Sequence, residues 1–232
     1  MKTERISEFT TQRLSVYLRC LEALEEMGVE RTSSKMLAER FNLNSAQIRK
    51  DLAYFGQFGV RGVGYIVKEL KQQLSSILGL NAGHKVCVVG AGNLGAALTD
   101  YQGFLKSGFS LVAAFDSSPG KIGGRSRSGV VIYDIKDLRE VVRREGIAMG
   151  IIAVPAEAAQ QVCNQLLDAG IRAILNFAPV RLNGRPNTAI KSIDLSISLE
   201  GLSFFLSKQS PDSQNLEQEQ KSDIPSSPTE TR

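Results

Sequence analysis

The sequence predicts an α/β protein in which a helical domain, residues 1–80, precedes a domain built on a parallel sheet, residues 81–206. Three observations predict this organisation. Leucines recur at helical spacing before residue 80, which indicates amphipathic helices packed together. After residue 85, short apolar runs alternate with helical patterns, which is typical of a parallel sheet with right-handed crossovers. Residues 207–232 are rich in Ser, Pro and Gln and predict a disordered polar tail.

Composition limits the functional class. The 232 residues, 42% of them hydrophobic, are enough for two cores, but no apolar run approaches the roughly 20 residues that span a bilayer. The first residues, MKTERISEFTTQR, carry charges and no apolar core, so we expect no signal peptide, no membrane partner and a cytoplasmic protein. A net charge of +4 is consistent with a nucleic-acid partner. Three well-separated cysteines in apolar stretches predict buried reduced thiols and no metal site: Cys20, Cys87 and Cys163.

The N-terminal domain begins with two predicted helices. The first runs from Ser7 to Met27, where leucines share one face, and Gly28 ends it. The second is short and runs from Ser34 to Phe41, with Thr32 or Ser33 as its cap.

The third predicted helix begins with Asn44 as N-cap, and Gln47 three positions later suggests a variant of the capping box. Its apolar side chains face the core: Ile48, Leu52 and Phe55. Its polar side chains project outward: Gln47, Arg49, Lys50 and Tyr54. Together with the second helix it forms a helix-turn-helix whose basic face suits the DNA major groove. The alternative is a small helical bundle with a solvated charged face.

A glycine-rich segment favours the DNA-binding interpretation. It predicts a tight hairpin with Arg61 near its tip, as a wing beside the third helix. Such a tip can place an arginine in a narrow minor groove, where the negative potential is enhanced. Residues 31–68 hold seven Lys or Arg against two acids. A helix from Tyr65 to Leu78 is predicted to close the domain. The glycines of the segment are Gly56, Gly59, Gly62 and Gly64.

The strongest signal for a nucleotide site is the stretch KVCVVGAGNLGAAL, residues 85–98. An apolar strand leads into Gly90, Gly92 and Gly95, spaced as G-x-G-x-x-G, and a helix follows. The first glycine allows a tight turn, the second lets a pyrophosphate approach the backbone, and the third lets helix and strand pack closely. Asp116 closes the next apolar run, which completes the context of a dinucleotide site. The alternative is a purely structural turn.

Asp116 also predicts which dinucleotide binds. A carboxylate at this position accepts hydrogen bonds from ribose hydroxyls and repels a 2′-phosphate, so we expect NAD(H) rather than NADP(H). Lys121 and Arg125 nearby weaken this expectation slightly. The predicted cofactor-binding residues are Gly90, Ala91, Gly92, Asn93, Leu94, Gly95, Asp116 and Pro155.

The remaining elements continue the alternation of strand and helix. Strands are predicted over residues 110–115, 130–132, 148–154, 173–176 and 192–194, and helices over residues 135–144 and 156–169. A final helix carries an apolar stripe of Leu195, Leu199, Leu202 and Leu206. This much apolar surface suggests burial against a partner, and docking on its own domain is the alternative.

Three segments together resemble the Rex family of redox-sensing transcriptional repressors: SSKMLAERFNLNSAQIRKDLAYFGQFGVRGVGY, VVGAGNLGAALTDYQGF and ILNFAP. The resemblance covers residues 7–206. It implies a homodimer with winged-helix N-terminal and Rossmann-like C-terminal domains, in which the C-terminal helix is exchanged between subunits. It also implies binding to inverted-repeat operator DNA, favoured by NAD⁺ and relieved by NADH. The residues expected at the DNA are Ser34, Gln47, Arg49, Lys50, Tyr54 and Arg61.

The resemblance further implies an Arg–Asp–Tyr switch between domains and subunits, formed by Arg19, Tyr101 and Asp194. Asp194 would pair with Arg19 or with Tyr101 according to whether NADH is bound. From the residues alone, Asp194 is equally a helix cap, Arg19 a solvated helix residue, and Tyr101 a packing residue of the helix that follows the glycine turn.

Two other functions are considered. An NAD-dependent oxidoreductase with an appended helical domain needs a positioned acid or base for hydride transfer. The single histidine, His84, precedes the first strand of the sheet, at the wrong end for a ligand crevice, and no tyrosine is followed by lysine four positions later. We therefore expect no catalytic residues and no metabolic substrate. A DNA-binding protein with a vestigial nucleotide fold is the third possibility.

Overall fold

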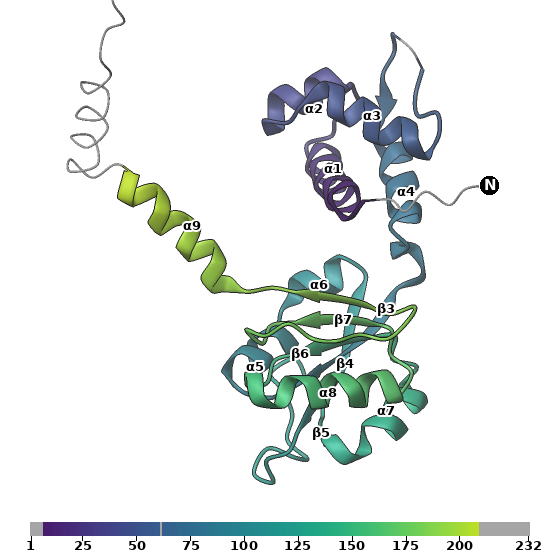
Figure 1. The fold of residues 1–232 in the computed structure, drawn as a ribbon. Helices are drawn as coiled ribbons and strands as arrows, with labels where there is room; N and C mark the ends of the chain where they lie inside the picture. The colour runs from purple at the N-terminus through teal and green to yellow at the C-terminus, as the bar shows by residue number, and fades with distance from the viewer. Residues whose placement is uncertain (1–6, 61, 209–232) are drawn as a thin grey trace, which may run out of the picture. The chain divides into compact units, whose positions relative to one another are not determined.

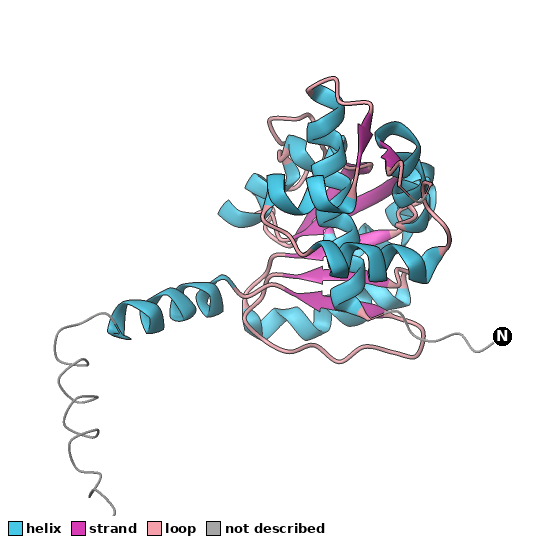
Figure 2. Cartoon of the chain, turned by 90° about the horizontal axis from the view of Figure 1, so that it is seen from above, coloured by secondary structure: helices cyan, strands magenta, loops and turns pink. Residues whose placement is uncertain are grey.

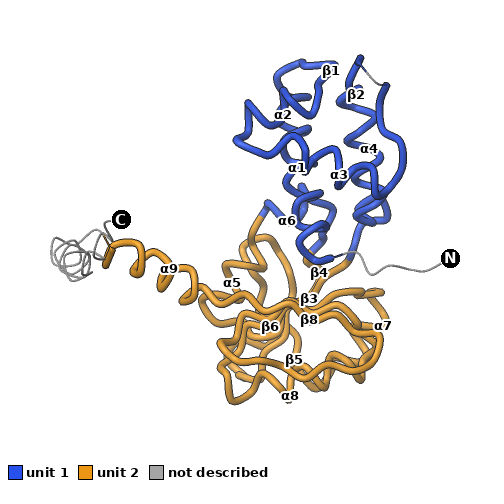
Figure 3. The backbone as a smooth tube through the Cα atoms, turned by 45° about the horizontal axis from the view of Figure 1, so that its top comes forward, with its two compact units in different colours: residues 1–84, 102–110 blue, residues 85–101, 111–232 orange. Residues whose placement is uncertain are grey.

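A computed structural model describes residues 7–60 and 62–208, and the chain divides into two compact units (Figure 3). Unit 1 comprises residues 1–84 and 102–110, and unit 2 comprises residues 85–101 and 111–232. The final helix extends through Lys208, so the predicted polar tail does not begin at residue 207. The rest of the predicted tail lies outside the described residues.

Unit 1 is a small helical domain with one hydrophobic core. Its first three helices are α1 (Glu8–Glu26), α2 (Ser34–Phe41) and α3 (Ser45–Phe55), as the sequence predicts. A fourth, α4 (Val67–Ile77), packs along α1 (Figure 1). The first three begin after cap residues whose side chains accept a backbone N–H: Ser7, Ser33 and Asn44. The centre of the core is fully buried: Leu14, Leu21, Leu37, Ile48 and Leu74.

The predicted start of the fourth helix at Tyr65 is wrong. Tyr65 and Ile66 form a strand, β2 (Tyr65–Ile66), that pairs antiparallel with β1 (Arg31–Thr32). A Cβ on Gly64, at φ +91°, would lie 2.3 Å from the Thr32 carbonyl oxygen, so the glycine lets the two backbones meet. Strands of two residues are too short to show a periodicity in sequence.

The predicted hairpin is present before β2. Val60 and Gly64 form an antiparallel bridge, in which each N–H donates to the other's carbonyl at 3.1 and 3.0 Å. Arg61, which the sequence predicts near its tip, lies outside the described residues. The glycines on either side adopt the left-handed backbone that such a turn needs.

A six-stranded sheet forms the centre of unit 2, in the order β5-β4-β3-β6-β7-β8. Figure 2 draws its strands in magenta. Its pairs run parallel; between β3 and β4 the His84 N–H donates to the Gly108 carbonyl and the Gly90 N–H to the Phe115 carbonyl. The chain therefore starts in the middle and builds outward on both sides, as in a doubly wound nucleotide-binding fold. The strands are β3 (His84–Val89), β4 (Phe109–Asp116), β5 (Ile132–Asp134), β6 (Met149–Ile152), β7 (Ala173–Asn176) and β8 (Ala189–Ser192).

The helices of unit 2 are α5 (Asn93–Thr99), α7 (Leu138–Glu145), α8 (Ala156–Asp168) and α9 (Leu195–Lys208). The short helix α6 (Gln102–Lys106) lies between α5 and β4 in the chain and belongs to unit 1. Two strands are displaced from their predictions. The strand predicted over residues 130–132 is β5, which ends in the polar residues Tyr133 and Asp134. The strand predicted over residues 192–194 is β8, whose largely exposed residues give no apolar run.

The helix after the glycine turn is shorter than predicted, so Tyr101 does not belong to it. α5 ends at Thr99, and the Asp100 carboxylate accepts hydrogen bonds from Ser128 N–H at 2.8 Å and Arg127 N–H at 3.3 Å. These bonds, led by that of Ser128, lower the pKa of Asp100 to about 2. Because Asp100 is tied to this distant turn, the chain leaves the helix there, and Tyr101 is 59% exposed between α5 and α6.

The three cysteines are free and buried, as predicted. Burial raises the pKa of the Cys87 thiol to about 12 and raises the pKa of Cys20 and Cys163 as well. Within residues 7–60 and 62–208, no helix is long and apolar enough to cross a membrane. The same part of the chain contains no cluster of three or more His, Cys, Asp or Glu suited to a metal ion.

Candidate functional site

The glycine turn joins β3 to α5, and two of its glycines are required by the packing of the protein itself. A Cβ on Gly90 would lie 2.4 Å from the Ala153 carbonyl oxygen, and Gly90 has φ +101°. A Cβ on Gly95 would lie 1.7 Å from the Gly90 carbonyl oxygen. Neither position has room for a side chain, because real contacts of a Cβ are longer than 3 Å.

Gly92 differs from the other two. A Cβ built on it meets nothing within 4 Å, and its φ of −76° is ordinary for any residue. Gly92 is the N-cap of α5, with no side-chain cap, and the first N–H groups of a helix have no partner within the helix. Bare backbone beside open space fits a pyrophosphate, which needs close approach to N–H groups. Asn93 and Leu94 are exposed at the same helix start.

The turn lies where the strand order reverses. β3 and β6 are neighbours, and the Ala153 N–H donates to the Val89 carbonyl at 2.8 Å. Pro155 follows directly as the cap of α8. The glycine turn and Pro155 therefore leave the same edge of the sheet, at the crevice where open parallel sheets bind their ligands.

Asp116 ends β4 and is 9% exposed. Its carboxylate accepts from Ala91 N–H at 2.8 Å, from Ser118 N–H at 2.8 Å and from Lys121 Nζ at 2.9 Å. Burial opposes ionisation, but these three bonds outweigh it and lower the pKa of Asp116 to about 2. Asp116 thus joins the glycine turn to the end of β4. The sequence placed Lys121 nearby without showing this ion pair.

His84 is the first residue of β3, at the opposite end of that strand from the glycine turn. One ring nitrogen lies 2.9 Å from the Gly79 carbonyl oxygen, and the ring stacks on Phe109. These contacts are packing contacts at the far end of β3, and their position agrees with the sequence argument that His84 lies at the wrong end of the sheet for hydride transfer.

The recognition helix α3 presents three of its four predicted polar residues to solvent: Arg49, Lys50 and Tyr54 are exposed. Gln47 is half-buried, and its side chain does not complete the predicted capping box. Asn44 caps the Gln47 N–H at 3.0 Å, but the Gln47 amide turns to Asp51 at 2.7 Å instead. Asp51, which the sequence showed only as an acid in a basic region, is the residue that the prediction missed.

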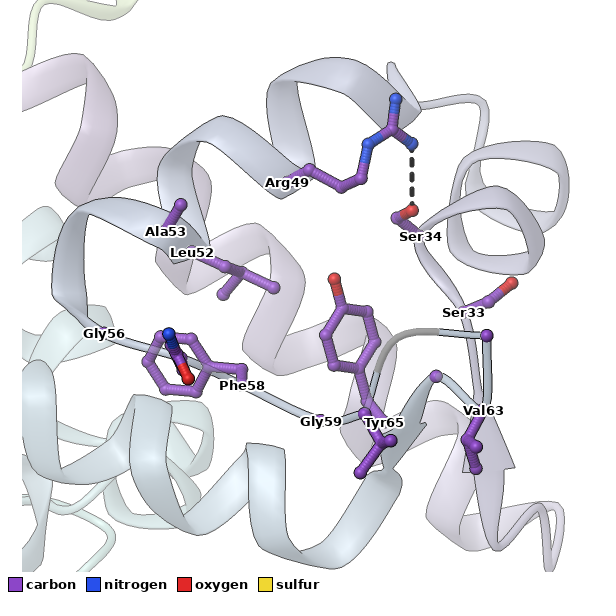
Figure 4. A pocket seen from close by; sticks show the side chains of 14 residues that line it. Ser33, Ser34, Arg49, Leu52, Ala53, Gly56, Phe58, Gly59, Val63 and Tyr65 are labelled. Carbon is purple, nitrogen blue, oxygen red and sulfur yellow. Dashed lines mark hydrogen bonds between the residues drawn. The ribbon is translucent and has the colours of Figure 1, made fainter.

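A hollow of about 630 Å³ lies between α3 and the hairpin (Figure 4). Arg49 reaches across to Ser34, where its Nη1 donates to the hydroxyl at 3.1 Å. Ser34 is 8% exposed at the first position of α2, so the predicted DNA residues Ser34 and Arg49 are in contact. An arginine beside a helix start and an open hollow suits a phosphate group. The residues that line the hollow include Ser33, Leu52, Phe58 and Tyr65.

Comparison with known proteins agrees with this arrangement. Residues 5–53 match the family described as "Putative DNA-binding protein N-terminus", and residues 81–180 match "CoA binding domain". The chain is 47% identical over 204 residues to the redox-sensing transcriptional repressor Rex of Desulfitobacterium hafniense, covering 88% of this chain and 97% of that one. It is 50% identical over 204 residues to the Rex of Carboxydothermus hydrogenoformans, covering 88% and 98%.

The chain belongs to the Rex family.

Solved structures of a Rex-family repressor called RSP share the fold. The structure of RSP with beta-NAD⁺ and operator DNA has a TM-score of 0.85 at 36% identity and covers 95% of this chain and 99% of RSP. The structure with beta-NADH has a TM-score of 0.79 at 36% identity and covers 89% and 97%. The expected fold, a winged helix-turn-helix domain followed by a Rossmann-like domain, is thereby confirmed. These Rex relatives are named as repressors, which are regulators rather than enzymes.

The residues that the Rex resemblance assigns to a switch lie in both units. Arg19 is exposed on α1 of unit 1. In unit 2, Tyr101 is exposed before α6, and Asp194 lies directly before α9. The Asp194 carboxylate accepts from Ser196 N–H at 2.9 Å, which is the helix-cap interaction that the sequence alone allowed.

Proposed function

We propose that this protein is a cytoplasmic transcriptional repressor that binds inverted-repeat operator DNA as a homodimer and senses the balance of NADH and NAD⁺, with NADH releasing it from DNA. One observation carries the proposal: a bare, open helix start at Gly92 lies in the same chain as a helix-turn-helix with a basic face. The structure of RSP with NAD⁺ and operator DNA covers 95% of this chain, and the structure of RSP with NADH covers 89% of it.

NAD(H) is the ligand that the nucleotide site suits best. The backbone of the glycine turn would bind the pyrophosphate, and Asp116 would accept hydrogen bonds from the adenosine ribose. Asp116 carries a negative charge at neutral pH, which disfavours a 2′-phosphate. The nicotinamide end would lie along the edge of the sheet that Pro155 shares. In this proposal the nucleotide acts as a bound signal and not as a redox substrate.

The DNA face would use its residues in two ways. Arg49, held by Ser34 at the start of α2, is suited to a backbone phosphate. Lys50 and Tyr54 are exposed on α3, so Lys50 would reach base edges such as guanine O6 and N7 in the major groove. Arg61, predicted from the sequence to lie near the tip of the hairpin, would contact the groove beside it or a phosphate.

Helix α9 supports the homodimer. Its apolar side chains are between 58% and 67% exposed, and they include Leu195, Ile197, Leu199, Leu202, Phe204, Phe205 and Leu206. Side chains of this kind stabilise a protein only when they leave water, at about 25 cal/mol per Å² of apolar surface. Exchange of α9 between two subunits would bury them. Asp194, at the start of α9, would then reach the partner subunit with the helix.

The test is an electrophoretic mobility shift with operator DNA and saturating NAD⁺ or NADH in turn. We expect a complex with NAD⁺ and its loss with NADH. DNA binding that neither nucleotide changes would contradict the sensing function, and binding of neither nucleotide in a fluorescence titration would point to a vestigial fold. Analytical ultracentrifugation of the full chain, and of Leu199→Asp and Phe204→Asp variants, tests the dimer.

A further inference from the structure

A buried carboxylate lies behind the recognition helix. Asp51, on α3, is 4% exposed, and each of its oxygens accepts two hydrogen bonds from side chains. Oδ2 accepts from Arg13 Nε at 2.6 Å and from the Tyr17 hydroxyl at 2.9 Å. Oδ1 accepts from Arg13 Nη2 at 2.7 Å and from Gln47 Nε2 at 2.7 Å. Arg13 and Tyr17 belong to α1, so the network ties α1 to α3.

The chemistry of this network fixes the orientation of one amide. The two-pronged hydrogen bond from Arg13 lowers the pKa of Asp51 and outweighs its burial, so Asp51 is ionised. An ionised carboxylate accepts hydrogen bonds and donates none. Gln47 must therefore direct its nitrogen, and not its oxygen, at Asp51. A glutamine in solvent is free to rotate its amide either way.

The position of Gln47 gives this orientation a consequence. Gln47 is the third residue of α3, and the N-terminal residues of a recognition helix are those that reach base edges. With its nitrogen held by Asp51, the amide has its carbonyl oxygen left to accept. In the major groove the hydrogen-bond donors are the adenine N6 and cytosine N4 amino groups.

We infer that Asp51 is a positioning residue for DNA recognition, which holds Gln47 so that its carbonyl oxygen accepts a hydrogen bond from an adenine or cytosine amino group. The inference rests on the proposed DNA binding and adds to it the chemistry read at one base pair. The rigid hold also avoids the ordering of a flexible side chain on binding, which otherwise costs affinity.

The first experiment compares the wild-type protein with Gln47→Ala and needs no change at the buried Asp51. A half-site is selected from random duplexes, and Gln47→Ala identifies the base pair at which discrimination is lost. At that pair, the base amino group is then replaced by hydrogen with a nucleotide analogue. We expect wild-type affinity to fall about tenfold and Gln47→Ala to show no change. If the wild type instead requires a guanine or thymine oxygen there, or if Gln47→Ala alters no base preference, the inference fails.

The second experiment tests Asp51 itself. Asp51→Asn should reduce discrimination at the same base pair about tenfold, and Asp51→Asn combined with Gln47→Ala should lose no more than Gln47→Ala alone. Tyr17→Phe is the matched control, because it removes one bond to the same carboxylate without touching Gln47, and it should keep the base preference.

One outcome separates the inference from the function on which it rests. Equal weakening of all sequences by Asp51→Asn, with base preference kept, would make the network a structural tie only and overturn the inference. In that case operator binding by the wild type and its response to NADH would still stand. If Asp51→Asn does not fold, the amino-group replacement decides.

Discussion

The glycine turn and helix α3 are suited to their proposed binding sites by opposite means. At the turn, the site is made of backbone, and Gly90 and Gly95 have carbonyl oxygens within 2.4 and 1.7 Å of where a Cβ would lie. At α3, the site is made of side chains, one of which is held from behind by the buried carboxylate of Asp51. The turn should therefore be intolerant of added atoms, whereas α3 should be sensitive to the loss of particular atoms while its fold survives.

The largest effect is expected from Gly95→Ala. Its Cβ would collide with the Gly90 carbonyl, which has no flexible end to move aside, and we expect about 3 kcal/mol of destabilisation. Gly92→Ala is the control, since its Cβ has open space, and it should keep the Tm of wild type while weakening NADH binding. Calorimetry and NADH fluorescence measure the two effects. Equal Tm losses in both variants would contradict the distinction between packing and ligand glycines.

Replacing Lys50 or Arg49 with alanine should lower the affinity for DNA and leave the stability of the folded protein unchanged. Lys50→Ala should cost about 1–3 kcal/mol and relax specificity at one base pair, as the loss of a base contact does. Arg49→Ala should weaken binding to all sequences alike and reduce the salt slope by about one. Both are measured by operator titrations over a range of salt. The recognition-helix assignment fails if neither variant changes operator affinity.

The switch variants should alter coupling more than either binding event. Arg19→Ala and Asp194→Ala are expected to abolish most of an NADH effect on operator affinity of about 5–150-fold, because allosteric coupling is typically 1–3 kcal/mol. Tyr101→Phe tests the hydroxyl alone. Operator affinity is measured with and without saturating NADH. If NADH changed operator affinity in all three variants as much as in the wild type, the switch proposal would be contradicted, while the proposed DNA site and nucleotide site would not be affected.

Asp116→Ala should weaken NADH binding about tenfold through lost charge-assisted hydrogen bonds, with DNA binding in the absence of nucleotide largely intact. The same titration with NADPH checks the cofactor. Tighter binding of NADPH than NADH by the wild type would overturn the assignment, and Lys121 would then be the residue facing the 2′-phosphate.

The smallest effect concerns pH. With a pKa of about 2 against an ordinary 3.8, Asp116 stabilises the folded state above about pH 4, and this contribution is lost as the pH falls towards 2. Lys121→Met removes one cause of the low pKa; since Lys121 is 42% exposed, we expect a loss of less than about 1 kcal/mol at pH 7. Urea unfolding should show a smaller difference between wild type and Lys121→Met at pH 2.5 than at pH 7.

The same contrast explains what sequence could predict. Caps and glycine spacing are local, so α1, α2, α3 and the turn at Gly90 were predicted correctly. The β1–β2 pair and the end of α5 depend on partners far along the chain, such as Thr32 for Gly64 and Ser128 for Asp100.

The same distinction between local and distant partners applies to the site residues. Asp116 was predicted from its distance along the sequence to the glycine turn, whereas the role of Asp51 depends on its hydrogen bonds with Arg13, 38 residues away. No periodicity contains such a pairing, and the i, i+4 spacing of Gln47 and Asp51 was the single local sign of it.

The buried cysteines limit the kind of redox signal to which this protein can respond. Peroxide and disulfide exchange act on exposed thiolates, and low pKa and access decide which cysteines react. Cys20, Cys87 and Cys163 are at most 6% exposed, and burial raises the pKa of all three thiols. Direct oxidation of these thiols is therefore disfavoured, and the redox signal that we propose for this protein would come from the bound nicotinamide and not from its cysteines.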